Sequence, residues 1–171
     1  MPWSSALQAT PSSDHIETLI DGCHAVSLKR NADSRGHLIE LLTTRGEPIE
    51  PIVHVYQVFA EPGSVRAWIY HAVQSDRLTF TDGTFRVVLF DIRESSPTYE
   101  QLTELIVGEG NPIRLKIPPF VVHGVQNIGD RRASYLNMPN QVFDLQNPDK
   151  YRVSADSPLV RFDWEAHCLQ S

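Results

Sequence analysis

The feature of this sequence that most constrains its fold is a regular punctuation by turn residues. Short segments rich in Val, Ile, Phe and Tyr alternate with Gly, Pro and Asp about every 8–12 residues, a spacing typical of β-sandwiches and β-barrels. No segment before residue 140 shows sustained helical periodicity with caps at both ends. The expected strands are Ala25–Leu28, Leu38–Leu42, Ile52–Phe59, Val65–Ala72, Leu78–Phe80, Phe85–Phe90, Leu102–Val107, Ile113–Ile117, Val121–Gln126 and Ala133–Met138. The pattern therefore predicts an all-β fold.

Asp82-Gly83 is the strongest single turn signal. This dipeptide favours a type I′ turn, and it predicts a hairpin between the strands at 78–80 and 85–90. Near the C-terminus, Leu159–Trp164 is interpreted as either a last strand or a segment that docks on the domain.

The chain is predicted to form one domain. It has 171 residues, 41% of them hydrophobic, and a domain of this size buries roughly 70% of the surface of its unfolded chain. We expect residues 1–15, which include Pro11–Asp14, to form a flexible arm, and residues 16–171 to form the domain. No internal repeat or linker divides that stretch.

Composition excludes several classes of partner. The formal net charge is −6 and the basic residues are scattered, which argues against a nucleic-acid surface. No apolar run approaches the roughly 20 residues that span a bilayer, and the N-terminus lacks the pattern of a signal peptide. Cys23 and Cys168 do not have the spacing of a metal or redox site. We expect a cytoplasmic protein that does not contact membranes.

Four stretches of the sequence, taken in order, resemble one known family. Asp33–Glu40 is similar to D-x-R-G-x-x-x-E, and Pro62–His71 is similar to P-G-x-x-R-G-W-H-Y-H. Val87–Tyr99 is similar to V-D-L-R-x-x-S-P-T-[FY], and Ile117–Gly124 to I-P-x-G-x-x-H-G. These are motifs of the dTDP-4-dehydrorhamnose 3,5-epimerase family.

The resemblance implies a fold, a ligand and a reaction. It implies a cupin or jelly-roll β-barrel with short C-terminal loop or helical elements. The mouth of the barrel would hold a nucleotide-diphospho-4-keto-6-deoxy sugar, and two chains would share strands in a homodimer. Members of the family invert carbons next to the ketone with a base and an acid on opposite faces, without a metal or an organic cofactor.

The residues that the family uses for proton transfer are replaced here. The base is a histidine three residues after the motif arginine, and this position is Ile69, which cannot accept a proton. The acid is a tyrosine six residues before a second tyrosine, and these positions are Asn137 and Phe143. The aspartate that orients the base falls at about Ser157, with Asp156 beside it.

The residues for ligand binding are better preserved. Arg35 and Arg66 match positions that would contact the diphosphate, which arginine can bind through two hydrogen bonds. Arg77 stands where the family carries a cation, and His123 matches a histidine at the barrel mouth. Each arginine could instead form an ion pair at the surface, and His123 could be a hydrogen-bonded core residue. Asp91 and Arg93 are expected to form a structural ion pair.

His71 is the candidate for a relocated base. Alternate side chains of a strand share a face, so His71 should point the same way as Ile69, about 6.6–6.8 Å further along. Asn137 could donate a hydrogen bond to a keto oxygen but cannot deliver a proton at neutral pH. Tyr56, Tyr70 and Tyr135 are candidate phenols that could equally belong to the core.

Three functions remain open. The chain could be an isomerase with a relocated base, a sugar-nucleotide-binding protein without turnover, or a barrel that takes another small substrate. Convergence of Arg35, Arg66 and His71 on one pocket would favour the sugar nucleotide, whereas a pocket of Trp68, Ile69, Phe143 and valines would favour an apolar ligand. The spacing of the histidines is poor for a metal, because the H-x-H pair of metal cupins is reduced to Ile69 and His71. No metal and no cofactor is expected.

Overall fold

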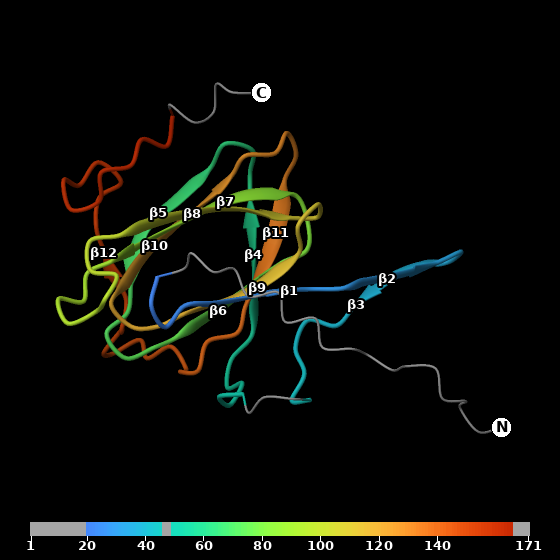
Figure 1. The fold of residues 1–171 in the computed structure, drawn as a ribbon, viewed down its shortest axis with the longest axis horizontal. Coiled ribbons are helices and arrows are strands. Elements are labelled where there is room, and N and C mark those ends of the chain that lie inside the picture. Colours follow the sequence, from blue (N-terminus) through green and yellow to red (C-terminus); the bar gives the residue numbers. More distant parts are fainter. Residues whose placement is uncertain (1–19, 46–48, 166–171) are drawn as a thin grey trace.

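Two antiparallel sheets face each other in the computed structural model, which describes residues 20–45 and 49–165 (Figure 1). The first sheet has five strands in the order β1 (His24–Ser27), β9 (Ile113–Ile117), β6 (Asp76–Phe80), β11 (Ala133–Asn137) and β4 (Tyr56–Ala60). The second has five strands in the order β12 (Tyr151–Arg152), β5 (Val65–Tyr70), β10 (Val121–Asn127), β7 (Thr84–Asp91) and β8 (Leu102–Gly108). This jelly-roll arrangement confirms the predicted all-β class. The predicted arm, residues 1–15, lies outside the described residues.

The predicted hairpin at Asp82-Gly83 is wrong, although the turn itself is present. β6 and β7 belong to different sheets, so the turn is a corner that carries the chain from one sheet to the other. Asp82 accepts a hydrogen bond from the backbone N–H of Ser134 at 3.0 Å, which ties the corner to β11. Gly83 has φ +63°, and a Cβ there would come within 2.2 Å of Ala133. The local sequence set the turn, and long-range pairing set the partners of the two strands.

The main core fills the space between the sheets. It includes Phe80, Phe85, Leu89, Ile113 and Leu115, each fully buried. Along β7 and β10, side chains that point into this core alternate with side chains that point to the outer face of the second sheet. The outer side chains pack in a second buried cluster. This second cluster consists of Trp68, Val88, Val122, Val160 and Trp164. The second sheet is therefore covered on both faces.

The C-terminal segment provides that outer cover. Leu159–Trp164 contains no strand, and its Val160 and Trp164 are buried against the sheet, so of the two alternatives it is the docking segment. Gly124 of β10 makes room for it, because a Cβ there would lie 2.6 Å from the Trp164 ring. Phe120, in the turn just before β10, has φ +58°, in the left-handed region, at the position where the family motif has a glycine.

One pair of strands stands apart from both sheets. β2 (Arg30–Asp33) and β3 (Gly36–Ile39) form a hairpin that projects from the body of the molecule (Figure 1). Both strands are largely exposed, and the side chain of Leu38 is among the exposed apolar groups. Within the described ranges, no helix is long and apolar enough to cross a membrane.

Candidate functional site

A cavity of about 400 Å³ lies between the two sheets, within the range that small-molecule sites occupy. The first sheet forms one wall with β4, β6 and β11, and the second sheet forms the opposite wall with β5, β10 and β12. The lining residues of the first wall are Tyr56, Val58, Asp76, Leu78, Tyr135 and Asn137. Those of the second wall are Val65, Arg66, Ala67, Ile69, His71, His123, Val125, Lys150 and Arg152.

From Ala67 to His71, alternation decides which side chains reach the cavity. Ile69 and His71 line it, as their shared face predicts, while Trp68 between Ala67 and Ile69 points to the opposite side. Trp68 is completely buried there, and its ring packs on Trp164 with a centroid distance of 4.9 Å. The expectation that Trp68 contributes to the pocket is therefore corrected.

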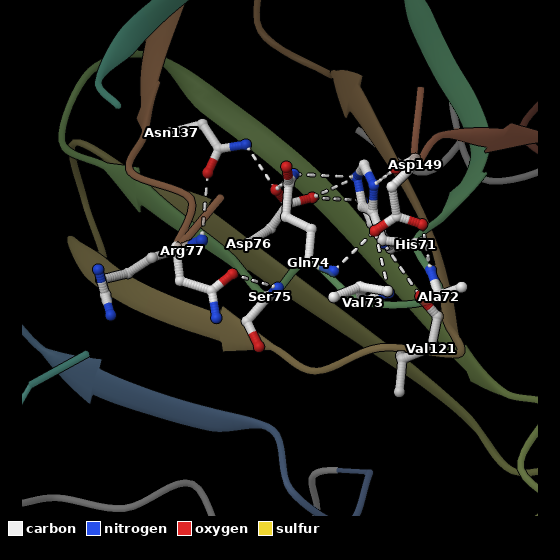
Figure 2. A network of polar contacts seen from close by, with 12 residues as sticks. His71, Ala72, Val73, Gln74, Ser75, Asp76, Arg77, Val121, Asn137 and Asp149 are labelled. Carbon is white, nitrogen blue, oxygen red and sulfur yellow. Dashed lines mark hydrogen bonds and ion pairs between the residues drawn. The ribbon is translucent and has the colours of Figure 1, made fainter. Parts of the chain in front are cut away.

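A buried carboxylate, Asp76, organises the polar end of the cavity, between Asn137 on one side and His71 on the other (Figure 2). Its Oδ1 accepts hydrogen bonds from Gln74 Nε2 at 2.7 Å and from Asn137 Nδ2 at 2.9 Å. Its Oδ2 lies 3.3 Å from Nε2 of both His71 and His123. Although burial favours the neutral acid, these partners hold the pKa of Asp76 far below its usual range, so it is a carboxylate.

His71 is engaged through both of its ring nitrogens. Nδ1 contacts the backbone carbonyl of Asp149, which can only accept, so Nδ1 carries a proton. Nε2 faces the Asp76 carboxylate and lies 3.3 Å from the amide nitrogen of Gln74. Burial disfavours the charged ring, but the bond to Asp76 and its charge outweigh burial and raise the pKa of His71. The protein therefore favours the cationic ring, in which both N–H groups face acceptors of the protein.

Asp149 holds the segment that follows β5. Its carboxylate accepts hydrogen bonds from the backbone N–H groups of Ala72, Val73 and Gln74, at 2.7–2.9 Å (Figure 2). The same residue holds His71 through its carbonyl oxygen. The loop before β12 thus fixes the orientation of the histidine and of Gln74.

Asn137 connects Asp76 to a phenol on the neighbouring strand. Its amide nitrogen donates to Asp76 and also to the hydroxyl oxygen of Tyr56, at 2.8 Å. Its amide oxygen accepts the backbone N–H of Arg77 at 3.1 Å, which fixes the orientation of the amide. Both amide protons of Asn137 are used, so this side chain does not have a free donor for a keto oxygen.

The cavity carries more positive than negative charge. Arg66, Lys150 and Arg152 line it, whereas Asp76 is the one carboxylate among its described lining residues. Arg66 donates to the carbonyl of Phe59 at 3.2 Å. The side chains of Lys150 and Arg152 make no hydrogen bond or ion pair with the residues that the structure describes. The guanidinium groups of Arg66 and Arg152 are available to an anionic ligand.

The structure brings some of the predicted site residues together and separates others. Five line the cavity, namely Arg66, Ile69, His71, His123 and Asn137. Arg35 lies on the projecting hairpin and pairs with Asp33, and Phe143 is half exposed outside the cavity. Arg77 points away from it, because its neighbours Asp76 and Leu78 take the cavity face of β6, and it donates to the Met138 carbonyl. The predicted site is therefore corrected for Arg35, Arg77 and Phe143, as for Trp68.

Sequence reasoning missed Asp76 and the two cations before and in β12. Asp76 lies on the strand after His71, whereas the family resemblance places the orienting aspartate near Ser157. Lys150 and Arg152 sit in a stretch with no periodicity, and β12 has only two residues. A usable signal was the alternation of Asp76 with Leu78 on one face of a strand. Among the described residues, no cluster of three His, Cys, Asp or Glu side chains is arranged to hold a metal ion.

Comparisons with known proteins point to one family. The family model described as dTDP-4-dehydrorhamnose 3,5-epimerase matches residues 17–171. The chain is 35% identical over 142 residues to a probable low-salt glycan biosynthesis epimerase, Agl13, of Haloferax volcanii. The matched region covers 81% of this chain and 90% of that protein. It is 30% identical over 146 residues to the spore coat polysaccharide biosynthesis protein SpsL of Bacillus subtilis, covering 85% and 97%.

Solved structures share the fold. A dTDP sugar isomerase from Desulfovibrio desulfuricans superposes with a TM-score of 0.79 at 26% identity, covering 85% of this chain and 92% of that one. The epimerase RmlC from Legionella pneumophila, solved with dTDP-4-keto-L-rhamnose, has a TM-score of 0.76 at 21% identity and covers 89% and 83%. The second likeness supports the jelly-roll fold alone.

Proposed function

Because the chain belongs to the dTDP-4-dehydrorhamnose 3,5-epimerase family, we propose that it inverts a carbon next to the ketone of a nucleotide-diphospho-4-keto-6-deoxy sugar. The observation that carries this proposal is the excess of positive charge in a cavity of about 400 Å³ between the sheets. A diphosphate is the part of such a ligand that requires cations, and guanidinium groups bind phosphate through two parallel hydrogen bonds.

Arg66 and Arg152 are the residues that we assign to the diphosphate. Both lie on the second wall, and Arg152 stands directly opposite Ile69 in the pairing of β12 with β5. The hydrogen bond of Arg66 to Phe59 leaves most of its guanidinium donors free. The apolar lining of Ile69, Leu78 and Val125 is suited to the methyl-bearing face of a 6-deoxy sugar.

His71 and Asn137 have a supporting role in this proposal. A base needs a lone pair directed at the substrate, but Nδ1 and Nε2 of His71 already face Asp149 and Asp76. Asn137 has no free amide proton for the same reason. We therefore assign to His71, Asp76 and Asn137 the positioning of neighbouring groups and the charge balance of the cavity.

Solvent-deuterium exchange tests the proposed function. The wild-type protein is incubated in heavy water with dTDP-4-keto-6-deoxyglucose and its UDP-linked counterpart, and NMR follows deuterium at C3 and C5. We expect uptake together with inversion at one of these carbons. Binding without uptake would replace the proposal by a sugar-nucleotide-binding protein without turnover. If neither occurs with either nucleotide, the cavity serves another ligand.

We also propose that two chains assemble through the β2–β3 hairpin. Arg35 is 87% exposed and lies on a hairpin outside both sheets, so within its own chain it does not line the cavity. An exposed apolar residue, Leu38, on the same hairpin favours a protein contact there. Light scattering should return the mass of two chains, and the mass of one chain would overturn this assembly.

A further inference from the structure

We propose that Tyr56 and Lys150 are the acid and the base of this site, taking over from the residues replaced by Asn137 and Ile69. This inference rests on the proposed function, because it assigns the two proton transfers of that reaction. It extends the proposal to residues that neither the sequence motifs nor the polar network around Asp76 identify.

The hydrogen bond from Asn137 leaves the proton of Tyr56 free. The Asn137 amide cannot turn around, since its oxygen accepts the Arg77 N–H at 3.1 Å. Its nitrogen therefore donates to the Tyr56 oxygen, and the phenol proton must point elsewhere. No residue that the structure describes accepts that proton. Tyr56 lines the cavity, so its donor is available to a ligand there.

Tyr56 also brings its hydroxyl to the place where the family's tyrosine would stand. It is the direct partner of Asn137 in the pairing of β4 with β11. Side chains of such partners on one face lie about 4.5–5.5 Å apart at Cβ. The phenol thus reaches the position of the lost acid from the adjacent strand. Burial and the Asp76 charge raise the pKa of Tyr56, which keeps the phenol protonated at neutral pH.

Lys150 occupies the corresponding place on the opposite wall. Since Tyr151 pairs with Tyr70 and Arg152 with Ile69, Lys150 falls opposite His71. The stack of Tyr151 on Tyr70, with ring centroids 4.9 Å apart, takes the outer face of these strands. Lys150 and Arg152 on either side of Tyr151 therefore share the cavity face with Ile69 and His71.

The surroundings of Lys150 lower its pKa. Burial and the charges of Arg152 and Arg66 lower the pKa of Lys150, against an opposing contribution from Asp76. Lysines with a lowered pKa act as general bases in many sites. The side-chain nitrogen has no hydrogen-bond or ion-pair partner among the described residues, so it is free to contact the substrate.

The two groups lie on facing walls, as inversion requires. Lys150 takes the proton from the carbon next to the ketone, the C–H electrons pass into an enolate, and the amine becomes an ammonium. Tyr56 then donates its proton to the opposite face of the same carbon, and the ketone is restored. Tyrosinate and ammonium exchange one proton through solvent, so the cycle is redox-neutral and returns both groups to their starting states.

Tyr56→Phe tests the acid. We expect deuterium uptake to continue, because the base can still remove a proton and return a deuteron on its own face. Inversion should fall by about 10²-fold or more, the usual contribution of a general acid. Tyr99→Phe is the matched control, because Tyr99 is half exposed and does not line the cavity. Unchanged inversion, or an equal loss of uptake and inversion, would overturn this role of Tyr56.

Lys150→Arg tests the base. The variant replaces the amine by a guanidinium, which cannot accept a proton at neutral pH. Uptake and inversion should both fall by about 10²-fold or more, while the dissociation constant of the nucleotide sugar changes little. Lys29→Arg, at an exposed lysine outside the cavity, is the control. Uptake at the wild-type rate in Lys150→Arg would show that its amine only binds the ligand.

The wild-type result separates the two levels of the argument. If the wild-type protein neither exchanges nor inverts, the proposed function fails before the acid and base are tested. If it does both and the two variants do so equally well, only the assignment of Tyr56 and Lys150 fails.

Discussion

Two buried carboxylates in this molecule have similar burial but different partners. Asp76 is 3% exposed and Asp91 is 0% exposed. Asp91 is held by Arg93, whose Nε and Nη2 donate at 2.8 Å, and by the Thr98 hydroxyl at 2.7 Å. In both cases burial alone would favour the neutral acid, and the hydrogen-bond partners lower the pKa well below its usual range.

The difference lies in whether the partner can change its charge. Arg93 stays protonated at any pH that the fold tolerates, so the Asp91 pair is permanent and lies outside the cavity. Asp76 instead faces two histidines that line the cavity, and one of them, His71, has a raised pKa and can lose its proton. A carboxylate with a permanent cation fixes the fold, whereas one with titratable partners sets the charge of a site.

The largest loss of stability is expected at Asp91, because its partner Arg93 cannot give up its charge. Asp91→Asn leaves the Arg93 guanidinium, 21% exposed, without its carboxylate, and should reduce the free energy of unfolding by about 3 kcal/mol. Urea unfolding measures this loss. Asp33→Asn is a matched control, because Asp33 pairs with Arg35 at the same spacing but on the exposed hairpin, and should not measurably change stability. A similar result for the two variants would contradict the structural role of Asp91.

A smaller loss of stability is expected when Asp76 is replaced, because its partner His71 can give up its charge. In Asp76→Asn, His71 can become neutral at little cost, so stability should fall by about 1–3 kcal/mol, less than at Asp91. The pKa of His71, followed by NMR of the ring protons, should fall at the same time, since Asp76 is what raises it. An unchanged His71 titration, or a loss of stability equal to that of Asp91→Asn, would remove the distinction between the two carboxylates.

The sequence predicted the parts of this comparison that depend on neighbours in the chain. Asp91 and Arg93 are two residues apart, and their ion pair was predicted and is confirmed. The positions of most strands were predicted as well, because alternation and turn residues are local signals. The partners of β6 were not, since Asp82-Gly83 describes a turn but not the sheet that each strand joins.

The candidate site was harder to predict, because its groups come from distant segments. Asp76 meets His71, His123 and Asn137 only after four strand segments have paired. The alternation of β5 did place Ile69 and His71 on one face correctly. It could not reveal that both nitrogens of His71 are engaged, because one partner, the Asp149 carbonyl, belongs to an irregular loop.

The smallest effect is the pH dependence of stability, which separates the two carboxylates in one titration. Both have lowered pKa values, so their contributions are present above the ordinary carboxyl pKa and are lost as the pH falls towards the folded values. His71 has a raised pKa, so its contribution is complete below its ordinary value of 6.5 and is lost as the pH rises through the folded value. Only the Asp76 site therefore produces an alkaline decline.

This decline can be measured by comparing urea midpoints at pH 6 and pH 8. The range stays below 9.0, where the thiol of Cys23 would ionise in the unfolded chain, since burial raises its folded pKa to about 12. The urea midpoint of the wild-type protein should be lower at pH 8 than at pH 6. The midpoint of Asp76→Asn should be nearly the same at both pH values. Asp91→Asn should show the same decline as the wild-type protein, with lower urea midpoints at both pH values. A wild-type midpoint that does not move would mean that the pKa of His71 is the same in the folded and the unfolded chain, whereas a midpoint that rises would mean that the ring is already neutral in the folded protein at pH 6. In the case of a rise, Nε2 of His71 would have a lone pair, and His71 instead of Lys150 would be the candidate base.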